Sequence, residues 1–209
     1  MIHIAIDGPA ASGKGSVARG LSERLGIPCL DTGAIYRGVA VWAREYGTVN
    51  LSAIRITAKI VDGITRVYLD GNKDVTDKLR DFEISLLSSQ LAHKPEVRAL
   101  CTRIAQQIAL DQSLIAEGRD ICTVVLPNAK YKFYIDGDIK VRAQRRLKDL
   151  QAKGENIPFK EVLKQMKKRD RLDRSKRGGL RKNKEAIRID ATNMTVDENV
   201  EYMLSYIQK

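Results

Sequence analysis

The sequence predicts an α/β protein with a doubly wound, five-stranded parallel sheet, meaning that helices cover both faces of the sheet. Three observations lead to this fold class. Short apolar segments alternate along the chain with stretches whose apolar residues recur at helical spacing. Glycine or an N-capping residue stands at several of the junctions. Apolar segments run into the polar strings DGPAAS, DTG, EGRD and DG, which would meet at the carboxyl edge of a parallel sheet, where ligands bind.

The amino-terminal residues predict the first two strands and helices. Residues 2–7, IHIAID, predict a short buried strand. The spacing of apolar residues over 14–25 predicts a helix that Gly26 ends. Residues 28–31 predict a second strand, and Thr32 is the expected N-cap of the helix that follows.

The middle of the chain has a different pattern, which indicates a small insertion. Residues 64–72 alternate between apolar and polar side chains and end in a DGN turn, so 73–76 are expected to form a return strand. Helical periodicity resumes over 80–92 and 95–111, where Pro95 suits the first turn.

The parallel pattern returns in the second half of the chain. The expected elements are strands 113–120, 131–137 and 186–190 and helices 138–151, 159–171 and 196–208. A chain of 209 residues is long enough for one well-buried core, so we expect a single domain. Its expected parts are a core of about residues 1–36, 112–152 and 185–209, an insertion of about 37–111 and a flap of about 153–184.

Several classes of protein are disfavoured by the composition. No apolar run reaches the roughly 18 residues of a membrane span, and the first residues lack the pattern of a signal peptide, so we expect a cytoplasmic protein. Cys29, Cys101 and Cys122 fit neither a disulfide framework nor metal-ligand spacing. His3 and His93 are expected to be structural, and no metal site is predicted from side chains.

The charge indicates an anionic partner. The net charge is +11, and residues 140–184 contain 18 Lys/Arg against 5 Asp/Glu. A solvated helical face accounts for many of these basic residues. Aromatic residues are only 5% of the chain, and none interrupts the basic run after Phe159, so stacking platforms for single-stranded nucleic acid are absent.

The string DGPAASGKGS, between the first strand and the first helix, predicts a phosphate-binding loop. Glycines let successive backbone N–H groups turn toward phosphate oxygens, and the Lys14 ammonium can reach the β- and γ-phosphates of ATP. Gly15 stands where a hydroxyl residue is usual, and the hydroxyl is shifted to Ser16, so Mg²⁺ is expected to be held mainly by ATP and water. The residues expected to bind ATP are Gly8, Pro9, Ala10, Ala11, Ser12, Gly13, Lys14, Gly15 and Ser16.

A second anion site is predicted after the second strand. In DTGAIYRG, Thr32 and Arg37 stand on the first turns of a helix, where they can hold an anion that faces the ATP phosphates. The string alone is also compatible with an ordinary capped helix.

Over nearly its whole length the chain resembles the bacterial cytidylate (CMP/dCMP) kinases. The strings that carry the resemblance are IDGPAASGKGS, LDTGAIYRGVA, LDGNKDVTD-LR, SSQLAHKPEVR, EGRDICTVVLPNAKYKFYIDG, VRAQRR, RDRLDRS and IDAT. Their joint order and spacing are more specific than any one of them. The resemblance implies a P-loop fold of the nucleoside monophosphate kinase type, with the insertion binding the monophosphate. It also implies Mg²⁺-assisted, in-line transfer of the γ-phosphoryl group of ATP to CMP or dCMP.

By the same resemblance, Thr32 and Arg37 contact CMP, and Ser89, Arg98 and Asp120 read the cytosine. A carboxylate such as Asp120 can accept from the exocyclic amine of cytosine, while Ser89 and Arg98 can donate to ring N3 and O2. Uracil would present a carbonyl to that carboxylate, so discrimination against UMP is expected.

The resemblance further implies that Arg119 and Arg169 hold phosphate and sugar and that Asp173 binds ribose hydroxyls. With Lys14, the two arginines form the expected catalytic set. Arg169 and Asp173 lie four residues apart, which also fits an exposed intrahelical ion pair. No dedicated general base is expected, because the reaction depends on alignment and charge neutralisation.

The chain departs from the family pattern after RDRLDRS. Lys176 stands where an arginine is common, Gly179-Leu180 replaces Pro-Leu, and Arg174 replaces a small hydroxyl residue. Either Lys176 or Arg177 is expected to clamp phosphate, and an ammonium lacks the bidentate grip of a guanidinium.

The expected partners are small nucleotides, namely ATP, CMP and dCMP, with no nucleic acid, no membrane and a monomeric protein. Two alternatives stay open. One is another small-molecule kinase on the same fold, acting on UMP, AMP or a non-nucleotide alcohol. The other is a nucleotide-dependent RNA-binding protein that uses the basic region 140–184.

Overall fold

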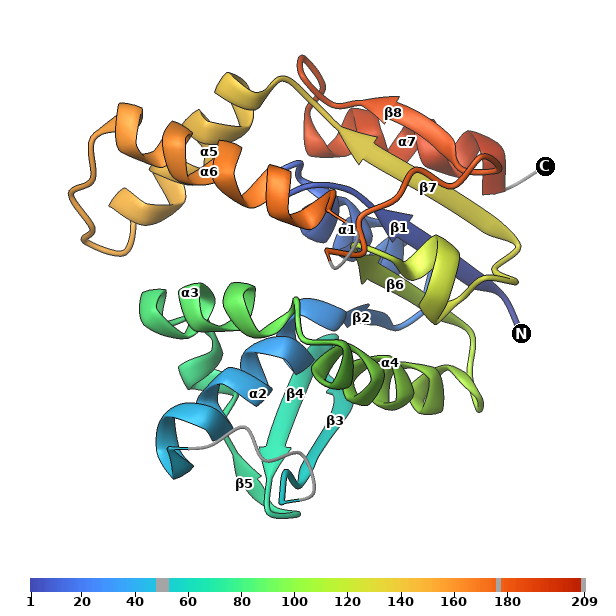
Figure 1. The fold of residues 1–209 in the computed structure, drawn as a ribbon. Coiled ribbons are helices and arrows are strands. Elements are labelled where there is room, and N and C mark those ends of the chain that lie inside the picture. The colour runs from blue at the N-terminus through green and yellow to red at the C-terminus, as the bar shows by residue number, and fades with distance from the viewer. Residues whose placement is uncertain (48–52, 176–177, 208–209) are drawn as a thin grey trace.

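The structure is a computed structural model that describes residues 1–47, 53–175 and 178–207. Helices pack around a central sheet, and a smaller sheet lies below it in the view of Figure 1. The strands are β1 (His3–Asp7), β2 (Cys29–Asp31), β3 (Ile56–Val61), β4 (Ile64–Leu69), β5 (Lys73–Asp74), β6 (Leu114–Gly118), β7 (Tyr131–Asp136) and β8 (Ile187–Asp190). The α-helices are α1 (Lys14–Leu25), α2 (Thr32–Tyr46), α3 (Phe82–Leu91), α4 (Pro95–Ala109), α5 (Ile139–Gln151), α6 (Phe159–Asp173) and α7 (Val196–Ile207).

The central sheet has the strand order β2-β6-β1-β7-β8, and all of its pairings are parallel. Its register places the carboxyl ends of the strands side by side: Asp31 pairs with Glu117, and Asp7 pairs with Gly118. The predicted α/β fold with a five-stranded parallel sheet is therefore confirmed. The polar strings that follow these strands meet at one edge, as the sequence predicts.

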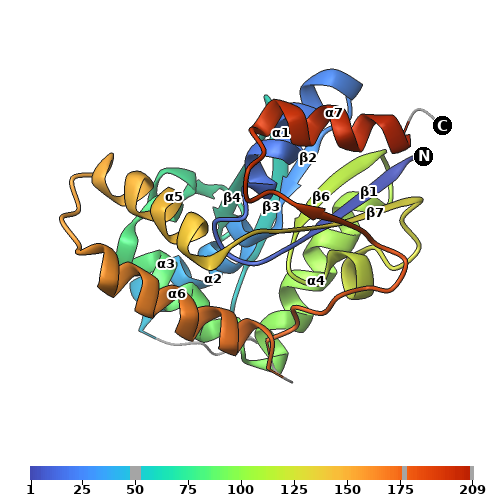
Figure 2. The ribbon, with the colours of Figure 1, turned by 90° about the horizontal axis from the view of Figure 1, so that it is seen from above.

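Alternation along β1 explains how helices cover both faces of this sheet. Ile4 and Ile6 pack with α1 and α7 in one apolar cluster, whereas Ala5 belongs to the cluster on the opposite face, with α2 and α4. Figure 2 shows α1 and α7 on one side of the strands and α4 on the other.

The insertion is built on the second of these clusters. Strands β3, β4 and β5 form an antiparallel sheet, and the same cluster contains Val67 of β4 and Val39 of α2. Gly38 allows the close approach, because a Cβ there would lie 2.6 Å from Val67 Cγ1. The division into core, insertion and flap stays a prediction, since the insertion shares its apolar cluster with the central sheet.

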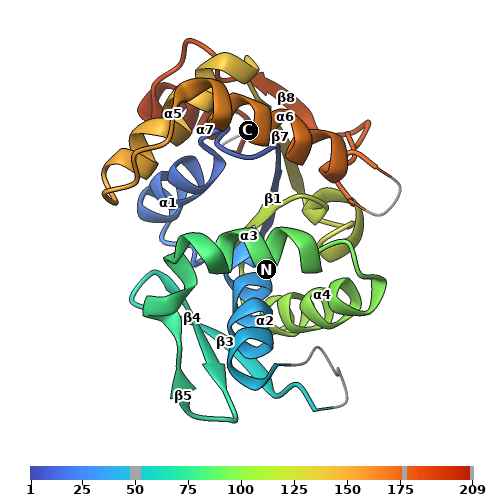
Figure 3. The same ribbon diagram turned by 60° about the vertical axis from the view of Figure 1, so that its left-hand side comes forward.

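Helices α5 and α6 form an antiparallel pair that extends from the end of β7 and lies across from α3 (Figures 1 and 3). The pair has an apolar cluster of its own, and Ala10 and Ala11 of the phosphate-binding loop pack against it. This contact places the α5–α6 pair directly over the loop.

Several local predictions are confirmed and others need correction. Gly26 ends α1 in the left-handed conformation with φ 66°, and Pro95 begins α4. Thr32 is not an N-cap: Asp31 caps α2 by accepting from the backbone N–H of Ala34 at 3.2 Å. Both residues are good caps, and the pairing of β2 with β6 ends the strand at the first of them.

Three elements were not predicted. One is the 3₁₀ helix Thr76–Arg80, so the return strand expected over 73–76 is limited to β5. Strand β3 follows an alternating pattern and joins β4 through Asp62-Gly63, both with positive φ, the geometry of a two-residue hairpin turn. A single π-helical turn covers Ile121–Val125. The described residues contain no helix that is both long and apolar enough to span a membrane.

Candidate active site

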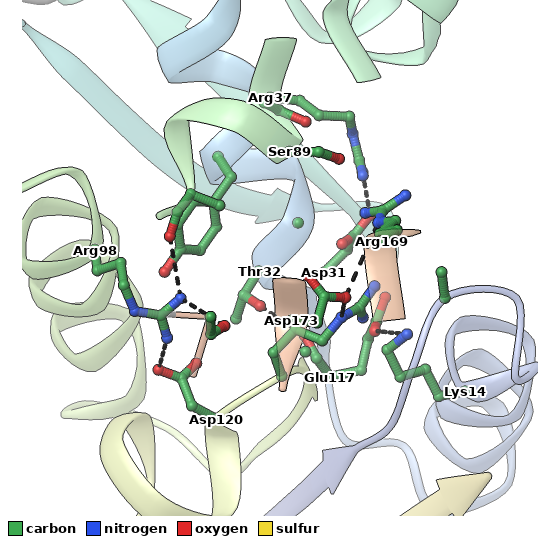
Figure 4. Close-up of a pocket in the computed structure, with 18 of the residues that line it drawn as sticks. Lys14, Asp31, Thr32, Arg37, Ser89, Arg98, Glu117, Asp120, Arg169 and Asp173 are labelled. Carbon is green, nitrogen blue, oxygen red and sulfur yellow. Dashed lines mark hydrogen bonds and ion pairs between the residues drawn. The ribbon is translucent and has the colours of Figure 1, made fainter. Parts of the chain in front are cut away.

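A pocket of about 220 Å³ opens at the carboxyl edge of the central sheet (Figure 4). It brings together predicted residues from six elements or their ends, and it also contains residues that were not predicted. The predicted residues in its wall are Ala10, Ala11, Lys14, Thr32, Arg37, Ser89, Arg98, Arg119, Asp120, Arg169 and Asp173. A second cavity, of about 520 Å³ and more apolar, continues from it between α3 and the α5–α6 pair.

The loop of residues 8–13 has the backbone of a phosphate cradle. A Cβ on Gly8 would lie 2.1 Å from the carbonyl oxygen of Ile135, so only glycine fits against β7. Ala11 and Gly13 both have positive φ, 55° and 90°. Gly13 is the N-cap of α1, whose first N–H groups lack intrahelical acceptors and lie at the positive end of the helix dipole. An anion is therefore the natural ligand of this loop.

Lys14 begins α1 and is buried at the bottom of the pocket. Its Nζ donates to the carbonyl oxygen of Pro9 at 3.2 Å and lies 3.8 Å from a carboxylate oxygen of Glu117. Burial and the like charge of Arg119 lower the pKa of Lys14 from 10.5 to about 8, although Glu117 acts in the opposite direction. A buried ammonium of lowered pKa beside like charges would be stabilised by the arrival of an anion.

Three arginines, Arg37, Arg119 and Arg169, also line the pocket. Arg37 Nη2 lies 2.6 Å from Asp31 Oδ2, whereas Arg119 Nε and Arg169 Nε lie 2.8 and 4.0 Å from the same oxygen of Asp173. Burial and the nearby guanidinium of Arg119 lower the pKa of Arg169 to about 10. The predicted i, i+4 pair of Arg169 and Asp173 is thus present, but Arg119 makes the closer contact.

The carboxylates respond to this cluster in opposite ways. Burial raises the pKa of Glu117 despite the attraction of Lys14. Burial acts in the same direction on Asp31 and Asp173, but neighbouring guanidinium groups outweigh it and hold the pKa of both below the ordinary value. Asp31 and Asp173 therefore stay ionised and pair with the guanidinium groups of Arg37 and Arg119.

Arg98 and Asp120 lie at the other end of the pocket from Lys14 (Figure 4). Arg98 Nη2 donates to Asp120 Oδ2, and Asp120 is 5% exposed. Burial raises the pKa of Asp120, an effect that Arg98 opposes. Tyr36 lies near both of these side chains, since Arg98 and Asp120 act on its pKa. Ser89 also lines the pocket, but it lies beside Arg37 in Figure 4, and its Oγ donates to the carbonyl oxygen of Ser85 at 3.0 Å. The end at Asp120 therefore offers a carboxylate and a guanidinium beside an aromatic ring.

Asp7 holds the turn that carries Arg119 and Asp120. Its carboxylate accepts from the backbone N–H groups of Ile121 at 2.7 Å and Cys122 at 3.0 Å. Burial raises the pKa of Asp7 to about 6 in spite of these hydrogen bonds. The sequence analysis missed Asp7, although its place at the end of β1, next to Gly8, is visible in the string IHIAIDG.

Other structural partners were also missed. Arg142 is buried and connects the loop to the α5–α6 pair, because it donates to Ala10 O at 3.0 Å and to Asp170 Oδ2 at 2.6 Å. Asp31 and Glu117 could have been found as carboxylates at the ends of predicted strands. Lys176 and Arg177, the alternatives for the phosphate clamp, lie outside the described residues.

The structure gives the contacts of Pro9, Ser12 and Ser16, and their role in ATP binding stays a prediction. Pro9 supplies the acceptor for Lys14, and Ser12 Oγ is buried and has no hydrogen-bond partner among the described residues. Ser16 Oγ accepts from Arg19 Nη2 at 3.3 Å.

Across residues 1–47, 53–175 and 178–207, no three or more His, Cys, Asp or Glu side chains gather as a metal site.

A phosphate loop at the first strand of a parallel sheet, with converging basic residues opposite it, defines a P-loop kinase. The solved structure of shikimate kinase from Bacteroides thetaiotaomicron resembles this chain with a TM-score of 0.53 at 10% identity, over 100% of this chain and 99% of that one. For a gluconokinase from Sinorhizobium meliloti 1021 the TM-score is 0.51 at 13% identity, over 99% and 91%. Such identities show the fold alone.

Within this class, the chain belongs to the cytidylate kinase family, whose family model matches residues 4–209. It is 39% identical to a cytidylate kinase from Fervidobacterium nodosum over 210 residues, covering 99% of this chain and 96% of the relative. It is 38% identical to one from Clostridium botulinum strain Hall over 214 residues, covering 100% and 98%. The resemblance expected from the sequence is confirmed.

Proposed function

We propose that this protein transfers the γ-phosphoryl group of ATP to CMP and dCMP. The observation that carries the proposal is the arrangement of one pocket: the pair of Arg98 and the buried Asp120 lies at one end, the phosphate loop with Lys14 lies at the other, and Arg37, Arg119 and Arg169 line the same pocket. Such a pocket suits two anionic substrates that meet head to head.

The donor half is the loop of residues 8–16. Its N–H groups and the N-terminus of α1 would bind the ATP phosphates, and Lys14 would reach the β- and γ-phosphates from below. The lowered pKa of Lys14 indicates that its ammonium lacks full compensation before the nucleotide binds. ATP would supply that compensation.

The acceptor half is the part of the pocket that would bind the nucleoside monophosphate. Asp120 would accept from the cytosine amine, Arg98 and Ser89 would donate to N3 and O2, and the Tyr36 ring lines the same wall. Arg37, Arg119 and Arg169 would hold the monophosphate, and Asp173 would bind ribose hydroxyls. Thr32 Oγ1, which donates to Glu117 O at 2.8 Å, would mainly fix the start of α2 against β6.

Mg²⁺ fits the donor half. A Cβ on Gly15 would lie 3.3 Å from Glu117 Oε1, so a carboxylate oxygen stands beside the place where a hydroxyl side chain is absent. Glu117 and the Ser16 hydroxyl are oxygen ligands of the kind that Mg²⁺ prefers and would hold the ion or its water. When bound, Mg²⁺ neutralises phosphate charge.

The mechanism depends on alignment and on neutralisation of charge. Lys14, Arg119 and Arg169 would stabilise the charge that spreads over the moving phosphoryl group, and the guanidinium groups would offset repulsion between the two nucleotides. Ala10 and Ala11 pack against the α5–α6 pair, which covers the loop and would exclude water from it. No proton-abstracting residue is needed in this scheme.

The test is a comparison of CMP, dCMP, UMP and AMP at saturating MgATP, with ADP formation as the readout. We expect the highest kcat/KM for CMP or dCMP and values at least about 10²-fold lower for AMP, because an unpaired Arg98 or Asp120 is costly. Lys14→Ala, purified in parallel, controls for contaminating kinases. Equal turnover of AMP and CMP would overturn the proposal, and turnover of UMP alone would establish the first alternative.

RNA binding is the remaining alternative. Retention of a labelled RNA that weakens steeply with salt, together with absence of CMP phosphorylation, would establish it. The monomeric state and cytoplasmic location expected from the sequence stay predictions.

A further inference from the structure

Arg98 is held by three segments that are far apart in the sequence. Its Nη1 donates to Ala92 O at 3.3 Å and to Gly178 O at 3.2 Å, and its Nη2 donates to Asp120. These acceptors come from the end of α3, from the chain after α6 and from the end of β6. The direction of the guanidinium therefore depends on where Gly178 lies.

Gly178 and Gly179 contact Arg98 through backbone atoms alone, since neither residue has a side chain. A Cβ on Gly179 would lie 2.0 Å from Arg98 Nη2 and 2.5 Å from its Cζ. A Cβ on Gly178 would lie 2.0 Å from Leu172 O and 2.3 Å from Asp173 O. Gly179 also has φ +79°, a conformation that L side chains rarely adopt. Any side chain at either position would move the backbone or the guanidinium.

This segment is anchored on both sides of the glycine pair. Gly178 N donates to Ser175 O at 3.0 Å, and Leu180 N donates to Asp173 O at 2.8 Å. Leu180 is 4% exposed and belongs to the largest apolar cluster of the described residues. The glycines are thus fixed relative to both α6 and the core, so they can fix Arg98 in turn.

We propose that Gly178 and Gly179 are positioning residues for base recognition: a bare carbonyl and the adjacent Cα together direct the Arg98 guanidinium onto Asp120. The inference rests on the proposed function, because it names the element that sets the geometry of the base-reading pair. It also links Asp173 at the end of α6 with Asp120, since the segment that contacts Arg98 hydrogen-bonds to Asp173 O. Displacement of this segment would leave the buried Asp120 without its guanidinium.

The test uses Gly179→Ala with Gly154→Ala as a matched control. Gly154 lies between α5 and α6 and has φ +81°, nearly that of Gly179, but a Cβ there would meet nothing within 4 Å. The two variants therefore share the cost of a left-handed alanine and differ in the contact with Arg98. We expect Gly179→Ala alone to raise KM for CMP about 10- to 100-fold, the loss of a charged hydrogen bond, with KM for ATP unchanged.

The ratio of kcat/KM for CMP over UMP should fall in Gly179→Ala and stay constant in Gly154→Ala. If the two variants behave alike in this ratio and in KM for CMP, the proposal is wrong. A double-mutant cycle of Gly179→Ala and Arg98→Ala, measured by thermal denaturation, tests the positioning role separately from the proposed function. The midpoint should fall more for Gly179→Ala in the wild-type background than without the Arg98 side chain.

The cycle does not depend on CMP being the substrate. If the cycle shows coupling between Gly179 and Arg98 but the wild-type protein fails to phosphorylate CMP, the proposed function is refuted and the positioning of Arg98 is retained. If the changes of the denaturation midpoint are additive and the wild-type protein phosphorylates CMP, the proposed function is retained and the positioning role is refuted.

Discussion

Titration of Lys14 makes the alkaline limit of activity a direct test of the pocket. The pKa of Lys14 is lowered from 10.5 to about 8 by burial and by Arg119, so the free protein loses this ammonium as pH rises through about 8. If Lys14 binds the phosphates of ATP as a cation, kcat/KM for ATP must follow its protonated fraction. We expect a plateau below pH 8, a fall of about tenfold at pH 9 and a slope approaching one decade per pH unit.

The limit should lie higher once nucleotide is bound. Phosphate charge stabilises the ammonium, so kcat at saturating ATP should decline at a higher pH than kcat/KM does. ADP formation should be followed by chromatography of quenched samples, because coupling enzymes have alkaline limits of their own.

Two variants move the limit in opposite directions. Glu117 raises the pKa of Lys14 and Arg119 lowers it. Glu117→Gln should therefore move the limit to lower pH, and Arg119→Gln should move it to higher pH, even though both variants lose activity overall. A limit at pH 10 or above in the wild type, or one that neither substitution moves, would refute the assignment to Lys14.

Three further predictions concern individual side chains. Lys14→Ala should lower kcat about 10³-fold or more while CMP binding, measured calorimetrically, is largely preserved; near-normal turnover would contradict its role. Asp120→Ala should lower kcat/KM for CMP about 10- to 100-fold and abolish the preference for cytosine with ATP affinity retained, and an unaltered base preference would remove Asp120 from base reading. The pKa of Asp7 is raised from 3.8 to about 6 in the folded protein, so protonation of Asp7 favours folding. This contribution to stability is complete below the unfolded-state pKa and is lost as pH rises through about 6. The stability of the wild type relative to Asp7→Asn should thus fall by roughly 2 kcal/mol between pH 4 and 7 in denaturant titrations, and a constant difference would show that Asp7 does not titrate there.

The sequence predicts most of the fold because its local signals agree with the tertiary structure. Apolar spacing, Gly26 and Pro95 all correspond to observed ends or faces of elements. The errors occur where a distant segment decides the outcome. Asp31 caps α2 because β2 pairs with β6, and the π-helical turn after Asp120 is shaped by a carboxylate 114 positions away.

The residues of the candidate site were predictable by type but not by pairing. Phosphate and base recognition call for Lys14, the arginines and Asp120, and the structure brings them into one pocket. Asp31 and Glu117 stand visibly at the ends of predicted strands, but their pairing was missed. The contact of Glu117 with Lys14 joins β6 to α1, which no local pattern shows, whereas Asp31 pairs with Arg37 only six positions along the chain.

The α5–α6 pair is held by a small apolar cluster of its own, so its local stability is lower than that of the central sheet and separate from it. Among the described residues, its buried members are Ala143, Leu150, Val162 and Met166, whereas two larger clusters enclose the sheet. Arg142 joins α5 to α6 through Asp170 and attaches the pair to the loop through Ala10 O. Amide hydrogens of α5 and α6 should therefore exchange through sub-global opening, well before those of β1, β6 and β7. Cleavage of the connection at residues 152–158 should leave the sheet folded, and transient detachment of the α5–α6 pair would expose Ala10 and Ala11 of the phosphate-binding loop, which pack against it.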